Sequence, residues 1–587
     1  MLQLAVTVLF YLVLVIPAGG YLYRILAHKR TLCDPVFDQV DGLIYRVGGV
    51  DPHKEMDWKQ YAAALVLTNA VMLFITYLVL RFQQLLFFNP NQIGGMEPTL
   101  SFNTVISFMT NTNLQHYSGE SGLSYLAQMV VIIFMMFTSA ASGYAVCAAF
   151  IRGLTGRSRT SVGNFYVDLV RVTTRILIPF SLVGGLLLVW QGVPQNLHSN
   201  IVVDTLEGAK QIITAGPVAA LEIIKHLGTN GGGFGGANSA TPFENPTVLT
   251  NLIEMYAMML LPGACVVAFG RMAQDSRQER LTAAAPKNAL SAAYHSTLTD
   301  RLMGREGRTI FAAMSILFLI GLSLCFWAES QGSPALASVG LSQSQGSMEG
   351  KEVRFGVPLS ALFTTVTTSF TTGTVNNMHD TLTPLGGLVP LLHMMLNVVF
   401  GGKGVGLMNM ILYAILAVFI CGLMVGRTPE YLGKKIEGRE MKLTALCIIV
   451  HPLLILLFSA IAVGTSAGQA GITNPGFHGL SQVLYEYASS AANNGSGFEG
   501  LADNTYFWNI TTGLAMFFGR YLSIVIQLAI VGSLMKKNFV NESAGTLRTS
   551  TMSFAVILVF VVYIFAALTF FPALALGPIA EHLALWS

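Results

Sequence analysis

Four stretches of this sequence place glycine, asparagine and threonine, rather than charged residues, at the end of a moderately apolar segment. One of them contains HLGTNGGGFGG (226–236), in which six of eleven residues are glycine. Glycine readily adopts the positive φ values that let successive carbonyls point the same way. Asparagine tolerates these values next best, and threonine adds a hydroxyl oxygen. Such uncharged loops are suited to binding a cation through oxygen atoms.

The four segments share one length and one order of features. Each is a helix-length stretch followed by a short polar loop, and three begin with proline, which suits the first turn of a helix. Each helical part has about 13 residues, or about 20 Å, which is too short to cross a bilayer. We predict four re-entrant segments, with ordinary extracellular loops as the alternative. They are PTLSFNTVISFMTNTN (98–113), PVAALEIIKHLGTNGGG (217–233), PLSALFTTVTTSFTTGTVNN (358–377) and LSQVLYEYASSAANNGSG (480–497).

Long apolar runs recur along the 587 residues. Hydrophobic residues make up 53% and charged residues 11% of the chain, whereas a soluble protein carries about a quarter charged residues. The sequence therefore predicts an all-α polytopic membrane protein with ten transmembrane helices. The seventh is too long for one simple crossing. We expect the helices at roughly 2–24, 60–81, 123–151, 172–191, 247–269, 309–328, 383–425, 443–464, 507–535 and 551–573.

Basic residues alternate between the two sides of these spans. The odd-numbered gaps hold clusters such as HKR, IRGLTGRSRT and RTPEYLGKKIEGREMK, whereas residues 465–506 contain no lysine or arginine. Because basic residues concentrate in cytoplasmic loops, both termini are predicted to be external. No basic residue precedes the first apolar run, so we interpret it as a retained helix and not a cleaved signal.

The re-entrant segments divide the chain into four pore repeats, each made of span, re-entrant loop and span. Repeats of this size suggest pseudo-symmetry about an axis along the membrane normal. Four loops around one pore would form rings of carbonyls at the negative ends of helix dipoles, and such rings can replace the hydration shell of K⁺. The predicted parts are an N-terminal extra helix with a cytoplasmic loop (1–55), the repeats (56–160, 161–300, 301–430, 431–540) and a C-terminal extra helix (541–587).

Phosphate binding by the glycine-rich loop is an alternative to cation binding. The chain has no G-x-x-x-x-G-K-[ST] motif, and no lysine follows the loop to open a helix. The missing charge also favours a monovalent ion, because divalent-cation pores usually use rings of Asp or Glu.

A glycine-rich stretch and a buried charge interrupt the later spans. VVFGGKGVGLMNM (398–410) contains four glycines and Lys403. Because unwound backbone at membrane depth must line a cavity or be buried in protein, we expect an intramembrane loop. The alternative is a cytoplasmic turn between two helices, which adds a span. Arg520 lies inside MFFGRYLSIVIQLAI. A charge within a span is functional by default, although an arginine that snorkels to the surface is the alternative.

Several long motifs resemble one family over essentially the whole chain. SFNTVISFMTNTNLQHYSGE, LGTNGGGFGGANSATPFENPT, GLMVGRTPEYLGKKIEGREMKLTAL and SSAANNGSGFEGL are similar to the KdpA family, the potassium-binding A subunits of Kdp ATPase complexes. The resemblance implies ten spans, kinship with a wider superfamily of potassium transporters, and a bacterial or archaeal plasma membrane.

The resemblance also implies a potassium selectivity filter and a gate beneath it. The threonine-rich third loop allows a register shifted by one residue. The gate is formed by the intramembrane loop, with Gly401, Gly402, Lys403, Gly404 and Gly406, together with Arg520. The filter residues are Asn111, Thr112 and Asn113, with Gln115 at the rim; Thr229, Asn230, Gly231 and Gly232; Thr372, Gly373 and Thr374; and Asn493, Asn494 and Gly495.

The family resemblance supplies partners that the chain itself lacks. The chain has no P-loop and no D-K-T-G-T phosphorylation motif, so we expect it to bind no nucleotide and to have no catalytic residue. The implied partners are a P-type ATPase B subunit that hydrolyses ATP, a single-span C subunit and, in some complexes, a small membrane peptide. Potassium is then the substrate, passed sideways to the B subunit. No nucleic acid partner is expected. A stand-alone potassium channel, an ion-coupled symporter and a membrane scaffold without an ion path are the alternatives.

Overall fold

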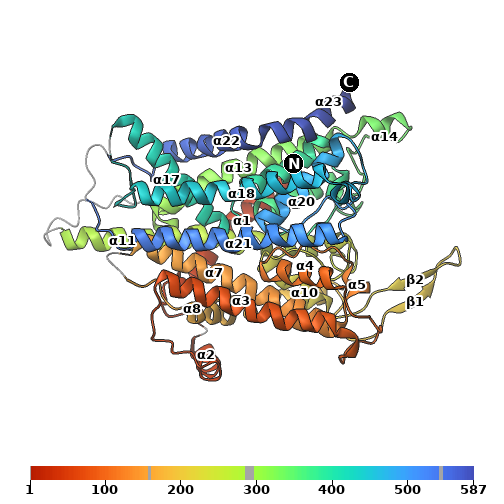
Figure 1. Ribbon diagram of the computed structural model, residues 1–587, viewed down its shortest axis with the longest axis horizontal. Coiled ribbons are helices and arrows are strands. Elements are labelled where there is room, and N and C mark those ends of the chain that lie inside the picture. The colour runs from red at the N-terminus through yellow and green to blue at the C-terminus, as the bar shows by residue number, and fades with distance from the viewer. Residues whose placement is uncertain (1, 33, 157–159, 285–296, 427, 541–545) are drawn as a thin grey trace.

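The computed structural model describes residues 2–32, 34–156, 160–284, 297–426, 428–540 and 546–587, and most of them are helical (Figure 1). In this part of the chain, ten helices or joined helices are long and apolar enough to cross a membrane. The predicted ten-span fold is confirmed. Six of the spans are single helices: α1 (Leu2–Leu26), α3 (Trp58–Arg81), α11 (Val248–Ala284), α17 (Val405–Val425), α18 (Gly438–Gly464) and α21 (Tyr506–Leu534).

The other four spans are joined from shorter pieces. Three of these joints contain π-helical turns, and the one in the tenth span also has a kink at Gly577, where the backbone is not helical. The third span joins α6 (Tyr125–Ala127), η2 (Gln128–Ile133) and α7 (Phe134–Thr155). The fourth joins α8 (Phe165–Val172), η3 (Thr173–Leu177) and α9 (Ile178–Trp190). The sixth joins α13 (Arg305–Ser330) and α14 (Pro334–Ser338), and the tenth joins α22 (Met552–Leu574), η6 (Ala575–Ile579) and α23 (Ala580–Trp586).

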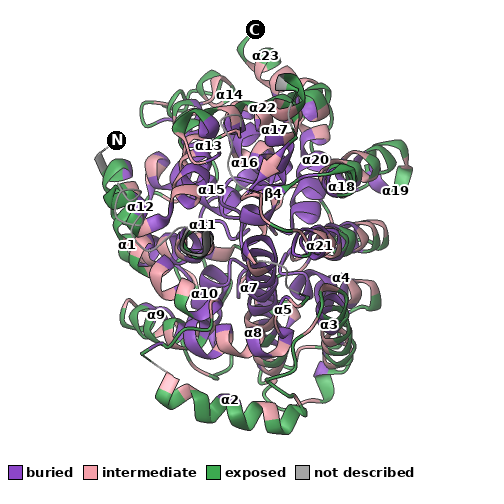
Figure 2. Cartoon of the chain, turned by 90° about the vertical axis from the view of Figure 1, so that its left-hand side faces the viewer, coloured by how far each residue is buried: buried purple, intermediate pink, exposed green. Residues whose placement is uncertain are grey.

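Four shorter helices occupy the predicted re-entrant segments. Their lengths of 12, 10, 14 and 16 residues correspond to about 15–24 Å, which is less than the bilayer core. Seen end-on in Figure 2, they lie nearer the middle of the bundle than α1, α3, α9 and α18. They are α4 (Pro98–Met109), α10 (Val218–Leu227), α15 (Gly356–Ser369) and α20 (Phe477–Ala492).

The predicted seventh span, 383–425, is not one helix. Helix α16 (Pro384–Leu396) ends at Asn397, whose φ of 49° is left-handed, and α17 starts at Val405. The connecting residues 397–404 are all buried. With 13 residues, α16 is about 20 Å long and does not cross a bilayer by itself.

Two elements outside the spans lie at opposite ends of the bundle (Figure 1). Strands β1 (Ile201–Asp204) and β2 (Lys210–Ile213) form an antiparallel hairpin that pairs Ile201 with Ile213. At the other end, α2 (Asp34–Gly48) is seen almost end-on in Figure 1 and from the side in Figure 2, so it runs across the spans. Neither element was expected from the sequence.

Several short elements complete the described chain. They lie in the connections between spans and re-entrant helices, and most have only two to six residues. They are η1 (Gln83–Leu85), α5 (Gly119–Gly122), η4 (Asn238–Ala240), α12 (Leu298–Met303), η5 (His379–Thr381), β3 (Glu430–Tyr431), β4 (Lys434–Lys435) and α19 (Ser466–Gln469).

Close backbone contact between α11 and α13 depends on two glycines. A Cβ atom placed on Gly270 would overlap the carbonyl oxygen of Met303 and lie 2.6 Å from the Cα of Gly307. Small residues allow this approach, and membrane helices associate mainly through such packing.

We expect Gly270→Leu to lower the melting temperature of the purified protein in detergent. Overpacking a helix contact costs about 1–3 kcal/mol. The matched control is Gly42→Leu in α2, because nothing lies within 4 Å of a Cβ at that position. Equal melting temperatures for the two variants would contradict the prediction.

Candidate cation-binding site

The loops that follow the four re-entrant helices share one backbone conformation. In each loop the first and third residues of a triplet have positive φ, which glycine adopts freely and asparagine tolerates. Threonine adopts it at a cost of about 1–3 kcal/mol. The pairs are Asn111 and Asn113 (both 59°), Thr229 (47°) and Gly231 (103°), Thr371 (47°) and Gly373 (98°), and Asn493 (54°) and Gly495 (108°).

A repeated hydrogen bond shows which residues of the four loops correspond. The N–H of each middle residue donates to the carbonyl oxygen five residues earlier. The four bonds are Thr112 to Ser107 (2.9 Å), Asn230 to Lys225 (2.7 Å), Thr372 to Thr367 (2.8 Å) and Asn494 to Ser489 (2.9 Å).

This correspondence shifts the third triplet from the expected Thr372, Gly373 and Thr374 to Thr371, Thr372 and Gly373. The physical reason is a hydrogen bond within the third segment, between Thr367 and Thr374. Thr374 lies outside the triplet, and its carbonyl accepts a hydrogen bond from the hydroxyl of Thr367 at 2.6 Å. The equivalent bond in the first loop joins Ser107 to the carbonyl of Leu114 at 2.8 Å.

The triplets meet one another in a ring. A Cβ on Gly231 would overlap the carbonyl oxygen of Thr372 in the third loop. A Cβ on Gly373 would likewise overlap the carbonyl oxygen of Asn494, and a Cβ on Gly495 would overlap the carbonyl oxygen of Thr112. The third residue of a triplet therefore abuts the middle carbonyl of the next loop. At these three positions only glycine leaves room for that oxygen.

Asparagine takes the place of this glycine in the first loop. Both polar side-chain atoms of Asn113 are buried and have no hydrogen-bond partner in the described part of the chain. Burying an amide without hydrogen bonds costs free energy. The side chain of Asn113 is therefore a buried polar group whose hydrogen-bonding capacity is not used by any other described residue.

Side-chain amides cross-link neighbouring loops. The Nδ2 of Asn111 donates to the carbonyl of Thr229 at 2.8 Å, and the Nδ2 of Asn230 donates to Oδ1 of Asn111 at 2.8 Å. Between the fourth and first loops, the Nδ2 of Asn493 donates to the hydroxyl of Thr112 at 3.0 Å. These bonds hold loops that lie far apart in sequence in one arrangement.

Gln115 joins the first and second loops at their outer side. Its Nε2 donates to the carbonyl of Gly233 at 3.0 Å, and its Oε1 accepts from the N–H of Gly233 at 2.9 Å. A Cβ on Gly232 would lie 2.8 Å from that Oε1. Gln115 and Gly232 therefore lie side by side beyond the triplets.

Lys403 reaches the opposite side of the ring. Its Nζ donates to the carbonyls of Asn111 at 2.6 Å and Asn493 at 2.7 Å. A Cβ on the adjacent Gly402 would lie 2.8 Å from the carbonyl oxygen of Thr371 and 2.5 Å from Oγ1 of Thr229. This dipeptide therefore contacts the first residue of all four triplets.

The other glycines of the intramembrane loop let it fold tightly in this position. The N–H of Gly401 donates to the carbonyl of Ser369 at 2.8 Å. A Cβ on Gly404 would overlap Cys147 of α7, and one on Gly406 would overlap the carbonyl of Phe400. The loop lies against the ring and not in a turn at the bundle surface.

Arg520 is a second buried cation beside Lys403. A Cβ on Gly143 of α7 would lie 2.7 Å from Cβ of Lys403 and 2.8 Å from Nη2 of Arg520. Among the described residues, none forms a hydrogen bond with Nη1 of Arg520. No carboxylate in the described part of the chain forms an ion pair with either side chain. Two positive charges therefore lie together without a counter-ion.

The comparisons with known proteins identify the family. A family model described as "Potassium-transporting ATPase A subunit" matches residues 5–583. The chain belongs to the KdpA family. It is 56% identical over 584 residues to the "Potassium-transporting ATPase potassium-binding subunit" of Clostridium acetobutylicum, covering 100% of both chains. It is 52% identical to the protein of the same name from Geobacillus kaustophilus, covering 99% of this chain and 98% of that one.

A solved structure shares the fold of this KdpA family member. The chain is similar to the crystal structure of the potassium transporter TrkH from Vibrio parahaemolyticus, with a TM-score of 0.52 and 14% identity. The match covers 89% of this chain and 98% of that chain.

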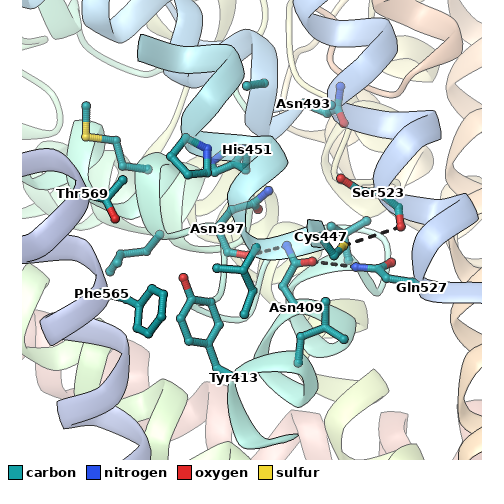
Figure 3. Close-up of a pocket in the computed structure, with 18 of the residues that line it drawn as sticks. Asn397, Asn409, Tyr413, Cys447, His451, Asn493, Ser523, Gln527, Phe565 and Thr569 are labelled. Atoms are coloured by element: carbon teal, nitrogen blue, oxygen red, sulfur yellow. Dashed lines mark hydrogen bonds between the residues drawn. The ribbon is translucent and has the colours of Figure 1, made fainter. Parts of the chain in front are cut away.

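A cavity in this KdpA family chain adjoins the ring beside the break between α16 and α17 (Figure 3). Its volume is about 50 Å³, enough for a few water molecules. Its lining comes from α16, α17, α18, α20, α21 and α22 and includes both Asn493 and Arg520. Asn409 donates to the carbonyl of Asn397 at 3.0 Å and accepts from Gln527 at 2.7 Å.

Charged groups behind the ring were missed by the sequence reasoning, which counted Lys225 only as an external basic residue. Lys225 is fully buried and pairs with Glu222 at 2.6 Å and Glu244 at 2.7 Å. The groups that could hold a metal are His116, Glu486 and Asp503, and Glu222, His226 and Glu254; within each set the ligand atoms lie within 4.8 Å of one another.

In the first of these sets the histidine is held as a cation. Nε2 of His116 lies 3.2 Å from Glu486 and 3.7 Å from Asp503. Burial works to lower the pKa of His116, but the carboxylates of Asp503 and Glu486 raise it to about 9. The histidine is therefore charged at neutral pH and forms a buried ion pair.

We expect Gly495→Ala to weaken potassium binding by roughly tenfold or more. The new Cβ would overlap the carbonyl oxygen of Thr112, and the φ of 108° is strained for alanine. A backbone strain of about 1–3 kcal/mol in the binding-competent loop would lower the affinity for potassium by roughly this factor. Isothermal titration with KCl would measure it.

The control for this prediction is Gly497→Ala, two residues along the same loop. A Cβ on Gly497 has no contact closer than the 3.6 Å to Oε2 of Glu486, so its affinity should stay at the wild-type value. Equal affinities for both variants would mean that the close packing of the ring is not required for binding.

Proposed function

We propose that this chain is the potassium-binding and translocating subunit of an ATP-driven, high-affinity potassium uptake pump. The proposal rests on one observation above all: four equivalent backbone loops form a ring without a charged side chain of their own. Rings of carbonyl oxygens replace the hydration shell of K⁺. Both relatives reported above are named as potassium-binding subunits of a potassium-transporting ATPase. The chain is then a non-catalytic subunit, and ATP hydrolysis belongs to a partner.

The proposed filter uses the residues predicted from the sequence, except that Thr371 replaces Thr374 through the register shift. The loops follow the C-terminal ends of α4, α10, α15 and α20. Because these helix ends carry partial negative charge, they attract a cation. The helices come from four pore repeats, for which we propose the boundaries 56–160, 161–300, 301–430 and 431–540.

Beneath the filter, the positive charges of Lys403 and Arg520 oppose straight passage of a cation. Fixed positive charge in a pore raises the barrier to cation flow. The cavity beside Asn493 offers a polar side route, since Asn397, Asn409 and Gln527 line it. We propose that K⁺ leaves the filter sideways through this region toward the partner.

The proposed partners are a P-type ATPase B subunit, a single-span C subunit and, in some complexes, a small membrane peptide. The proposed location is a bacterial or archaeal plasma membrane with both termini external. The alternation of basic gaps supports this orientation. The C-terminal end and the β1–β2 hairpin lie at one end of the bundle, opposite α2.

We expect the purified chain alone to show neither ATPase activity nor potassium flux in liposomes. With its B and C partners, it should support potassium-stimulated ATP hydrolysis. The physical reason is that the proposed exit beneath the cation site is closed, and that the sequence has neither a P-loop nor a D-K-T-G-T motif. Flux through the lone chain would instead support a stand-alone channel or an ion-coupled symporter.

We expect Gly231→Asp to abolish potassium-stimulated ATP hydrolysis by the assembled complex while leaving assembly intact. The new Cβ would overlap the carbonyl oxygen of Thr372, and the side chain would add a negative charge to an uncharged ring. The control is Gly438→Asp at the start of α18, where nothing lies within 4 Å of a Cβ. Normal potassium stimulation of the Gly231→Asp variant would mean that this loop is not part of the filter, and would favour a scaffold role.

A further inference from the structure

Lys403 places a positive charge directly on the carbonyls of the filter. Its side chain is fully buried. Its two hydrogen bonds, at 2.6 and 2.7 Å, go to the carbonyl oxygens of Asn111 and Asn493. These are charge-assisted bonds, which are shorter and stronger than neutral ones.

The two acceptors belong to one layer of the ring. Asn111 and Asn493 are the first residues of their triplets, and Thr229 and Thr371 are their equivalents in the other two loops. The neighbouring Gly402 lies against those two threonines. The ammonium therefore lies at the innermost layer of the ring, and Asn493 of this layer also lines the cavity.

The ligands of this ammonium are those that a potassium ion would use. No carboxylate in the described part of the chain forms an ion pair with Lys403. Its charge is balanced only by carbonyl dipoles and by the negative ends of the surrounding helices. An ammonium group and K⁺ both carry one positive charge, so two such cations cannot share one small site.

We propose that the Lys403 ammonium is a tethered cation that occupies the innermost ion position of the filter, and that it must leave before K⁺ can enter the cavity. This inference rests on the proposed function and concerns the regulation of that same site. An arriving K⁺ repels the ammonium. The flanking Gly402 and Gly404, the latter with φ of 81°, allow the chain to retract.

The test counts the cations bound by the purified, assembled complex, with Rb⁺ as the probe at saturating concentration. Lys403→Met removes the charge and keeps a long side chain, and we expect it to bind one more Rb⁺ per complex than the wild type. Lys403→Arg keeps the charge, so its count should equal that of the wild type. Lys537→Met is the control, because Lys537 pairs with Glu437 and Glu440 away from the filter.

An equal Rb⁺ count for Lys403→Met and the wild type would overturn this inference, while potassium-stimulated activity of the wild type would leave the proposed function standing. No Rb⁺ binding by the wild type would overturn both. A second measurement needs no variant: the wild-type complex, imaged with Rb⁺, should show no ion between the carbonyls of Asn111 and Asn493. Rb⁺ density there would overturn the inference.

Discussion

The whole structure depends on how backbone polar groups are satisfied where helices end inside the membrane. In hydrocarbon, an unpaired N–H or carbonyl costs several kcal/mol. Here each loop pairs its middle N–H with the carbonyl five residues earlier, and asparagine amides join one loop to the next. Positive φ at the first and third residues of each triplet follows from this bonding. The spanning helices surround these loops and exclude lipid from them.

Opposite charges act on the two sides of the ring. The re-entrant helices end at the loops and contribute partial negative charge there. Two basic side chains, Lys403 and Arg520, lie on the other side, and Arg520 lines the cavity. In the function proposed above, a cation is attracted into the ring and repelled from the straight path beyond it. Such an arrangement suits a subunit that must hold an ion until a partner takes it.

The four loops share a backbone conformation but differ in their side chains. The residue that accepts the repeated bond is Ser107, Lys225, Thr367 or Ser489. The lysine needs buried carboxylates, and Glu222 and Glu244 supply them at 2.6 and 2.7 Å. Truncating one member of such a network would leave an uncompensated buried charge and cost about 3–5 kcal/mol. These ion pairs therefore stabilise the second loop in the shape that it shares with the other three.

The sequence by itself determined the spans and the re-entrant segments, because hydropathy, helix length and glycine content are local properties. Most residues of the proposed filter followed from the resemblance of its motifs to one family. Tertiary structure decided the rest. The register of the third loop depended on a bond from Thr367, since neighbouring threonines look alike in sequence. Lys403 meets Asn111 across 292 residues, and Arg175 binds Asp41 of α2 across 134 residues. No local pattern predicts such pairs, because they form only when the folded chain brings distant segments together.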